Sequence, residues 1–250
     1  MNIAGSLPTV TATQMAEIDR IMLQDLGVGS LQLMELAGHA VASFARAHLL
    51  DNLPLGKRIV VLAGTGGNGG DGMVAARLLT AWGAEILVIT TRAVEDHTGF
   101  ALHQLGILQR WGLPIVDGSI DNPAPIPGDI DLIIDGLLGF SLEGNPQGTA
   151  AVLIDAANAA SAPVLAIDLP SGLNATTGEI GSPCIRATTT LTLALAKTGL
   201  GENGAEAVTG DLWLADIGVP LAAYARIGIP LSAALFAARP FLQLSTRRPA

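Results

Sequence analysis

The sequence predicts an α/β fold in which a mostly parallel sheet is covered by helices on both faces. Short apolar runs typical of buried strands alternate with segments of helical periodicity, and this alternation is the pattern of parallel sheets. The chain has 250 residues, half of them apolar, which is enough for one large core. We therefore expect residues 1–250 to form a single domain, with its core at about 11–220 and a helical tail at 221–250.

The chain is expected to open with two helices. Thr11 and Gln14 have the spacing of a capping box, and apolar residues then recur at helical intervals up to about Leu26. Ser30 is a suitable N-cap for a second helix, whose apolar stripe continues to about Leu49. Two helices should therefore precede the first strand.

Strands and helices are then expected to alternate. Arg58–Ala63 is a short β-branched run that ends in a glycine cluster and precedes a helical pattern at Met73–Trp82. Further strands are expected at Glu85–Thr91, Leu132–Asp135, Pro163–Asp168, Thr189–Leu195 and Leu212–Ile217. Helices are expected at Thr98–Arg110 and Thr149–Ala160, and the Pro-rich segment 122–128 reads as a surface loop.

Composition excludes several classes of function. With 13 basic and 22 acidic residues the net charge is −9, which repels a polyphosphate backbone and argues against nucleic acid as a partner. Every apolar stretch is interrupted well before the roughly 18 residues needed to span a bilayer, so no membrane partner is expected. The single cysteine, Cys184, allows no internal disulfide, which fits a reducing cytoplasm.

The segment Gly64–Gly72 is the first candidate binding element. Its six glycines in nine residues let a ligand approach the backbone above a helix N-terminus, where a phosphate could dock. Glycines are also needed at any tight strand-to-helix turn, so a plain turn remains the alternative. Asn68 and Asp71 add polar groups that a phosphate cradle does not need, and they suggest a nearby cation or hydroxylated ring.

Asp135 and Asp168 end two of the other apolar runs. Because the carboxyl ends of parallel strands lie at one edge of a sheet, both carboxylates should converge on one crevice with Asn68. Each aspartate could instead cap the turn that follows it, but convergence is the better explanation of both together. Lys197 could reach a substrate phosphate, although a lysine at a strand end is more often a solvated surface group.

Several segments in order carry a family resemblance: residues 11–38 with Asp19, GTGGNGGDG at 64–72, DGLLGFSLEGNP at 135–146, DLPSG at 168–172, TLT at 190–192 before Lys197, and DIGVP at 216–220. Over about 11–220 the chain resembles the YjeF N-terminal family. This resemblance implies a Rossmann-like three-layer α/β/α sandwich, often dimeric, so a homodimer is an expectation. The activity it implies is NAD(P)H-hydrate epimerase, which interconverts the R and S forms of NADHX and NADPHX.

The resemblance also assigns roles by position. It makes Asp168 a substrate-binding residue and the acid/base, and it implies a potassium ion (K+) held by Asn68, Asp135 and Ser171. The substrate-contacting residues implied are Gly67, Asn68, Gly69, Gly70, Asp71, Gly139, Phe140, Ser141, Leu142, Glu143, Gly144 and Asn145. Many relatives carry an additional dehydratase domain, so the chain is expected to act with a separate NAD(P)H-hydrate dehydratase.

Two departures from the family pattern keep an alternative open. The family usually has Asn-Asn where this chain has Gly67-Asn68, and it has a different turn at Phe140-Ser141. These changes favour a nucleotide-binding or scaffold module without turnover, whereas retention of Asp168 and the potassium ligands favours the enzyme. A conventional NAD(P)-dependent oxidoreductase is disfavoured, because Thr90, Thr91 and Arg92 stand where a ribose-binding acid is needed.

Overall fold

A computed structural model describes residues 7–118, 126–202, 204–232 and 235–246. Its strands form one sheet in the order β3-β2-β1-β4-β5-β6-β7-β8, parallel throughout except for β8, which is antiparallel to β7. The strands are β1 (Arg58–Ala63), β2 (Glu85–Thr90), β3 (Ile115–Asp117), β4 (Leu132–Gly136), β5 (Val164–Ile167), β6 (Thr189–Leu193), β7 (Asp211–Ala215) and β8 (Phe241–Ser245). The predicted fold class is confirmed.

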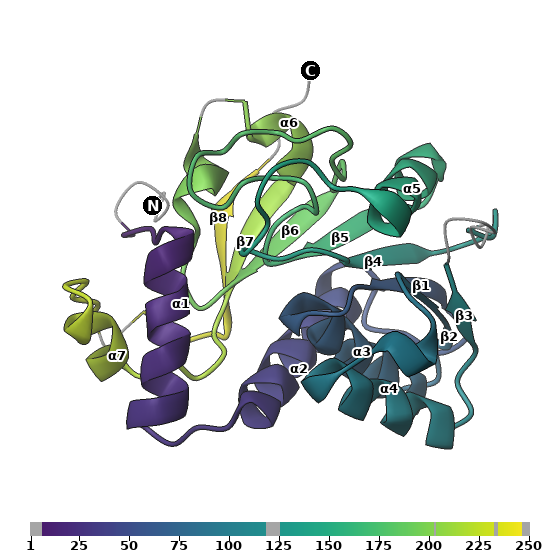
Figure 1. Ribbon diagram of the computed structural model, residues 1–250, viewed down its shortest axis with the longest axis horizontal. Helices are drawn as coiled ribbons and strands as arrows, with labels where there is room; N and C mark the ends of the chain where they lie inside the picture. Colours follow the sequence, from purple (N-terminus) through teal and green to yellow (C-terminus); the bar gives the residue numbers. More distant parts are fainter. Residues whose placement is uncertain (1–6, 119–125, 203, 233–234, 247–250) are drawn as a thin grey trace.

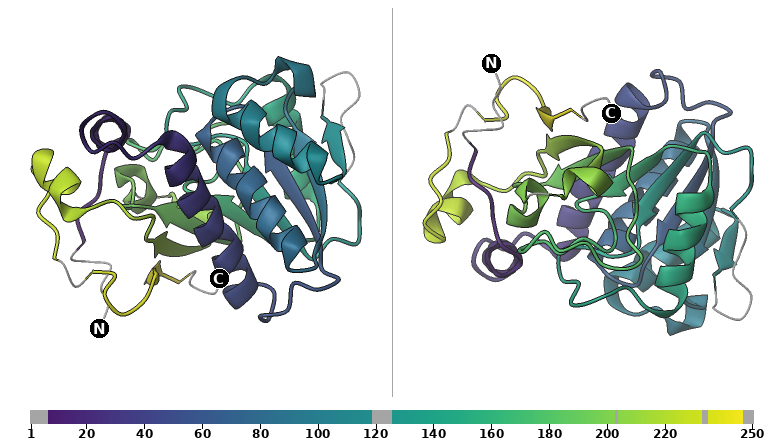
Figure 2. Two further views of the ribbon diagram at one scale, coloured as in Figure 1. Left: turned by 90° about the horizontal axis from the view of Figure 1, so that it is seen from below. Right: turned by 90° about the horizontal axis from the view of Figure 1, so that it is seen from above.

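Helices cover both faces of this sheet. Those described are α1 (Ala12–Arg20), α2 (Ser30–His48), α3 (Gly67–Ala81), α4 (Gly99–Arg110), α5 (Gly148–Ala159), α6 (Glu206–Thr209) and α7 (Leu221–Arg226), with a π-helical turn η2 (Ile21–Asp25) and 3-10 turns η3 (Val94–Asp96) and η4 (Thr198–Gly201). Helices α2, α3 and α4 lie on one side of the sheet and α5 on the other (Figure 1). Figure 2 shows α1 and α7 at the same end of the molecule. Among the described helices, no candidate for a membrane span is found.

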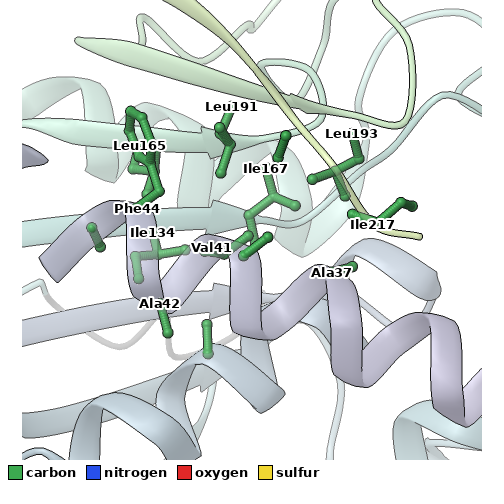
Figure 3. Close-up of a cluster of buried hydrophobic side chains, with 14 of the residues drawn as sticks. Ala37, Val41, Ala42, Phe44, Ile134, Leu165, Ile167, Leu191, Leu193 and Ile217 are labelled. Atoms are coloured by element: carbon green, nitrogen blue, oxygen red, sulfur yellow. The ribbon is translucent and has the colours of Figure 1, made fainter. Parts of the chain in front are cut away.

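Two apolar layers sandwich the sheet. In β1, Ile59 and Val61 belong to the layer under α2 and α3, whereas Val60 and Leu62 belong to the layer under α5. Because both faces are buried, the strand is apolar at successive positions rather than at alternate ones. In Figure 3 the side chains of Val41 and Phe44 on α2 lie towards the strand residues of the sheet. Full burial of each large side chain of this kind contributes roughly 1.5–3 kcal/mol.

The predicted helix starts are partly right. The Thr11 capping box is confirmed, because Thr11 Oγ1 accepts from the Gln14 amide at 3.2 Å and Gln14 Oε1 accepts from the Thr11 amide at 2.9 Å. Ser30 as N-cap is wrong: Gly29 holds that position, and its amide donates to Gln32 Oε1 at 2.7 Å. The third helix begins at Gly67, six residues before the predicted Met73, since its first turn consists largely of poor helix formers.

The predicted helical tail is also wrong. Among the residues of 221–250 that the structure describes, only Leu221–Arg226 is helical, and Phe241–Ser245 forms β8 along the edge of the sheet. Leu242 and Leu244 are buried and alternate with the exposed Gln243, which is the period of a half-buried strand. The short strand β3 was not predicted, and most of the Pro-rich loop expected at 122–128 lies outside the described residues.

Candidate functional site

A cavity of about 840 Å³ opens at the carboxyl edge of the sheet. It lies where β1 and β4 are neighbours, the point at which the strand order reverses and open α/β sheets bind ligands. The loops after these strands supply 64–68 and 137–141, the end of β6 supplies Leu193, and the segments after β5 and β6 supply Asp168 and Lys197. Helices α1 and α2 close the other side with Met15, Asp19, Leu33 and Met34. Elements far apart in sequence therefore share one cavity.

The glycines of the first loop have two separate purposes. A Cβ at Gly64 would lie 1.9 Å from the carbonyl oxygen of Leu137, and one at Gly69 would lie 1.9 Å from that of Gly64. Gly64 therefore lets the loops after β1 and β4 pack backbone against backbone, and Gly69 lets the first turn of α3 pack against the start of its own loop. Gly66 and Gly67 have no atom within 4 Å of such a Cβ, and both line the cavity. The plain-turn explanation therefore applies to part of the loop only.

Asp168 is held by a network around one carboxylate oxygen. Its Oδ1 accepts from Thr192 Oγ1 at 3.2 Å and from the Leu193 amide at 3.1 Å, and it forms an ion pair with Lys197. The residue has φ of +66°, a left-handed conformation that is uncommon outside glycine. Asp168 is 4% exposed, and none of the hydrogen bonds in the described parts of the chain involves its Oδ2. One oxygen is thus fixed by three contacts, the other takes no part in them, and the residue lines the cavity.

Lys197 corrects the sequence-based expectation of a solvated lysine. The residue is 1% exposed, and Nζ donates to the carbonyl oxygen of Leu193 at 2.9 Å as well as to Asp168. The segment before α1 covers it: the Val10 amide donates to Ala196 O and the Thr198 amide donates to Val10 O, both at 2.9 Å. The covering segment lies nearly two hundred residues earlier in the sequence, so the residues next to Lys197 do not reveal that it is buried.

Two further carboxylates line the same cavity. Burial raises the pKa of Asp19 to about 6, although the positive charge of Lys197 acts in the opposite direction. Burial also raises the pKa of Asp71 well above its usual range, and the charges of Asp168 and Asp19 add to the effect. Asp19 was not predicted as a site residue. The available signal was its position four residues after Met15, within the apolar stripe of α1.

Asp135 and Ser171 lie behind the cavity wall and bond to each other. Asp135 is fully buried; Ser171 Oγ donates to its Oδ1 at 2.6 Å and the Ser171 amide donates to its Oδ2 at 2.8 Å. Burial raises the pKa of Asp135 to about 6, and these hydrogen bonds act in the opposite direction. Asn68 approaches the pair, since its Nδ2 donates to Leu138 O at 3.0 Å and the Leu138 amide donates to Ser171 Oγ at 2.9 Å.

The remaining predicted contacts divide between the cavity and its supports. The cavity is lined by Gly67, Asn68, Asp71, Gly139, Phe140, Ser141 and Asp168. Its lining does not include Gly69, Gly70, Leu142, Glu143, Gly144 or Asn145. Gly70 packs against Met34, and Asn145 Oδ1 accepts from the Ser182 amide at 2.9 Å, which anchors the second loop. The structure thus brings part of each predicted segment to the cavity surface and leaves the other residues outside the lining.

Comparison with known proteins identifies the family. A family model described as YjeF-related protein N-terminus matches residues 30–199. The chain belongs to the YjeF N-terminal family. The match includes Asn68, Asp135, Asp168, Ser171 and Lys197 and leaves out Asp19. The resemblance inferred from the ordered motifs is therefore confirmed.

Relatives of this YjeF N-terminal domain carry informative names. A protein of Dehalogenimonas lykanthroporepellens named NAD(P)H-hydrate epimerase is 38% identical over 226 residues, which cover 90% of this chain and 87% of that protein. A bifunctional NAD(P)H-hydrate repair enzyme of Moorella thermoacetica is 37% identical over 84% of this chain but only 40% of its own length. The crystal structure of yeast ynu0, YNL200c, superposes with a TM-score of 0.78 at 25% identity and covers 95% of this chain and 100% of that one.

Proposed function

We propose that this YjeF-family chain is an NAD(P)H-hydrate epimerase that interconverts the R and S forms of NADHX and NADPHX. The names of relatives that match over most of both chains support this assignment. The observation that carries it is the Asp168 carboxylate, fixed through Oδ1 at the cavity wall with Oδ2 free. A module that only binds nucleotides has no need for a carboxylate held in this way.

The reaction requires a group that exchanges a proton. Inversion at the hydroxylated carbon C6 of the nicotinamide ring needs a bond to that carbon, or the ring itself, to open and close. Either route moves a proton at the hydroxyl group or at the ring nitrogen. Asp168 Oδ2 is the group that takes this proton and returns it, and the burial of Asp168 keeps bulk water from competing.

The cavity suits a dinucleotide in size and charge. Its volume of about 840 Å³ is within the usual range for small-molecule sites. Gly67 and Asn68 begin α3 at its edge, where free backbone amides favour a phosphate. Arg92, which also lines the cavity, supplies a positive charge for the same group.

We also propose that Asn68, Asp135 and Ser171 hold a potassium ion. Their side chains offer oxygen ligands, which hard cations prefer. The fit is supported by Asp135, a fully buried carboxylate that forms none of the salt bridges found in the described part of the chain. A cation would offset this buried charge and would stabilise negative charge that develops on bound substrate. Epimerase activity should rise with potassium and persist in zinc chelators; a loss restored by zinc would contradict the assignment.

Asp168→Asn tests the acid/base role. The change keeps size and most hydrogen bonding but removes proton exchange, so turnover at saturating NADHX should fall roughly 10²–10⁴-fold while binding changes little. Ser171→Ala is the control, since loss of one cation ligand should be partly rescued by high potassium, and Asp168→Asn should not be. Near-normal turnover in Asp168→Asn would leave this residue as a binding group only.

The same reaction separates the enzyme from the non-catalytic alternative. The protein is added to mixed R- and S-NADHX with an S-specific dehydratase, the type of enzyme that we propose it works beside in the cytoplasm. An epimerase lets the dehydratase deplete both forms, whereas a nucleotide-binding module leaves the R form untouched. A titration with NADP+ then shows whether an inactive protein still binds a dinucleotide.

A further inference from the structure

We propose that Lys197 is a positioning residue: its ammonium group holds the Asp168 carboxylate in the orientation that presents Oδ2 to the cavity. The proposal extends the proposed function, in which Asp168 is the acid/base. Nothing in the composition or the motif spacing suggested it. It depends on three observations: the contacts of Nζ, the charges that face Asp168, and the cover that seals the lysine.

The contacts fix the carboxylate from one side. Lys197 Nζ bonds to Asp168 Oδ1 and to the carbonyl oxygen of Leu193, which in turn stands beside the amide that donates to the same Oδ1. With Thr192 Oγ1, three donors converge on Oδ1, and one of them is an ammonium that is also anchored to a backbone carbonyl. Rotation of the carboxylate about its bond to Cβ would break these contacts, so Oδ2 has one available direction.

The surrounding charges would otherwise act against this orientation. Asp19 of α1 and Asp71 of α3 line the same cavity as Asp168, and the negative charge of Asp168 raises the pKa of both. Like charges disfavour an ionised carboxylate that turns towards them. Lys197 is the ion-pair partner of Asp168 among the salt bridges of the described residues, so its attraction opposes this repulsion.

The cover over Lys197 makes the arrangement rigid. Val10 forms a parallel bridge with Lys197, and the hydrogen bonds on both sides of this bridge close the segment before α1 over the lysine. An ammonium that is 1% exposed has lost its hydration, which is costly unless it is paired. The lysine is therefore committed to Asp168 rather than exchanging between this carboxylate and water.

The central test deletes the side-chain ammonium of Lys197 by mutation and replaces it with a soluble amine. Lys197→Ala should lower kcat for NADHX about 100-fold, the effect of a misplaced catalytic group, and change KM less than threefold. Methylammonium at saturating potassium should restore at least 10-fold of this loss, whereas sodium and tetramethylammonium at equal concentration should not. A lysine that only stabilises the fold gives no such rescue. Unchanged kcat in a folded Lys197→Ala protein overturns the proposal, as does a loss that methylammonium does not relieve.

A second measurement does not depend on activity. The crystal structure of Lys197→Met should show the Asp168 carboxylate turned from its wild-type position. If it shows the carboxylate in place, Lys197 does not position it. Lys57→Met is the matched control, because Lys57 is the other lysine of the chain and lies outside the cavity. Should the wild-type protein not epimerise NADHX, the proposed function fails, while this structural comparison still decides the role of Lys197.

Discussion

The two lysines of this chain form ion pairs with aspartates in opposite environments. Lys57 and Asp131 meet at 3.0 Å at the amino edge of the sheet, with side chains 35% and 34% exposed. Lys197 and Asp168 meet at the carboxyl edge, with side chains 1% and 5% exposed. The first pair links the starts of β1 and β4, since Asp131 Oδ2 also accepts from the Arg58 amide at 2.8 Å. The second pair faces the cavity.

The difference teaches where an ion pair indicates function. Water and salt screen the exposed pair, and such pairs usually contribute only about 0.2–1 kcal/mol. The buried pair loses the hydration of both charges, and well-packed apolar residues in its place are often as stable or more so. Stability alone therefore gives little reason to bury Lys197 with Asp168. A reason is available in the chemistry that a fixed carboxylate performs at the cavity.

Removal of one buried partner should produce the largest change in stability. Lys197→Met leaves the Asp168 charge buried and unpaired, so we expect the free energy of unfolding to fall by about 3–5 kcal/mol. Urea denaturation followed by circular dichroism measures it. The double variant Lys197→Met with Asp168→Asn removes both charges and should recover most of the loss. If the double variant is as unstable as the single one, the packing of the lysine matters more than its charge.

An intermediate effect on stability is expected at Asp19, whose pKa is influenced by the charges of Lys197 and Asp168. Its pKa of about 6 in the folded protein lies above the value of 3.8 expected when unfolded. Between these values the native state keeps a proton that the unfolded state has released, so this group makes stability fall as pH rises from about 4 to 6. Asp19→Asn removes that fall, by at most about 1.4 kcal/mol per pH unit. Urea denaturation at pH 4, 5, 6 and 7 measures the slope.

Asp25 provides a control of opposite sign for this slope. Hydrogen bonding to Arg20 lowers the pKa of Asp25 in the folded protein. Its native state therefore releases the proton at lower pH than the unfolded state, and the stability it adds is present above about pH 4 and lost below. Asp25→Asn should remove a small rise with pH rather than a fall. Slopes that change in the same direction in both variants would contradict the charge environments described for these residues.

The smallest effect is expected at the exposed pair. Lys57→Met should lower the free energy of unfolding by less than about 1 kcal/mol, and 1 M salt should abolish most of the difference. Epimerase activity should be unchanged, because Lys57 lies outside the cavity. A loss comparable with that of Lys197→Met would remove the contrast between the two pairs.

The sequence predicted elements whose signals are local. Both ends of the strand Arg58–Ala63 were predicted correctly, because a strand that is buried on both faces has a continuous apolar sequence. The beginning of α3 was missed, since its glycines disfavour a helix that tertiary packing imposes. In the tail, β8 was missed because alanine-rich sequence before it suggested a helix, whereas pairing with β7 decides its structure.

The candidate site divides in the same way. Asp135 and Asp168 could be placed at one sheet edge because each ends an apolar run, and parallel strands end together. Lys197 was assigned to the surface, because its burial depends on Val10 and on an aspartate from another strand. Asp19 lies on a helix before the sheet, and only the folded chain brings it to the cavity. The local sequence pattern carries no information about these contacts between distant segments, so both residues were missed.

Close backbone contacts of the first cavity loop, with the second loop at Gly64 and within itself at Gly69, also limit which substitutions this sequence tolerates. A side chain at Gly64 or Gly69 would collide with a carbonyl oxygen of the backbone, an atom that no mutation elsewhere can replace with a smaller one. A second substitution elsewhere therefore cannot relieve either collision, so both positions should remain glycine in this backbone. Gly67 has open space around its Cβ direction. A single substitution can therefore add a polar side chain to the cavity wall at this position without moving the backbone.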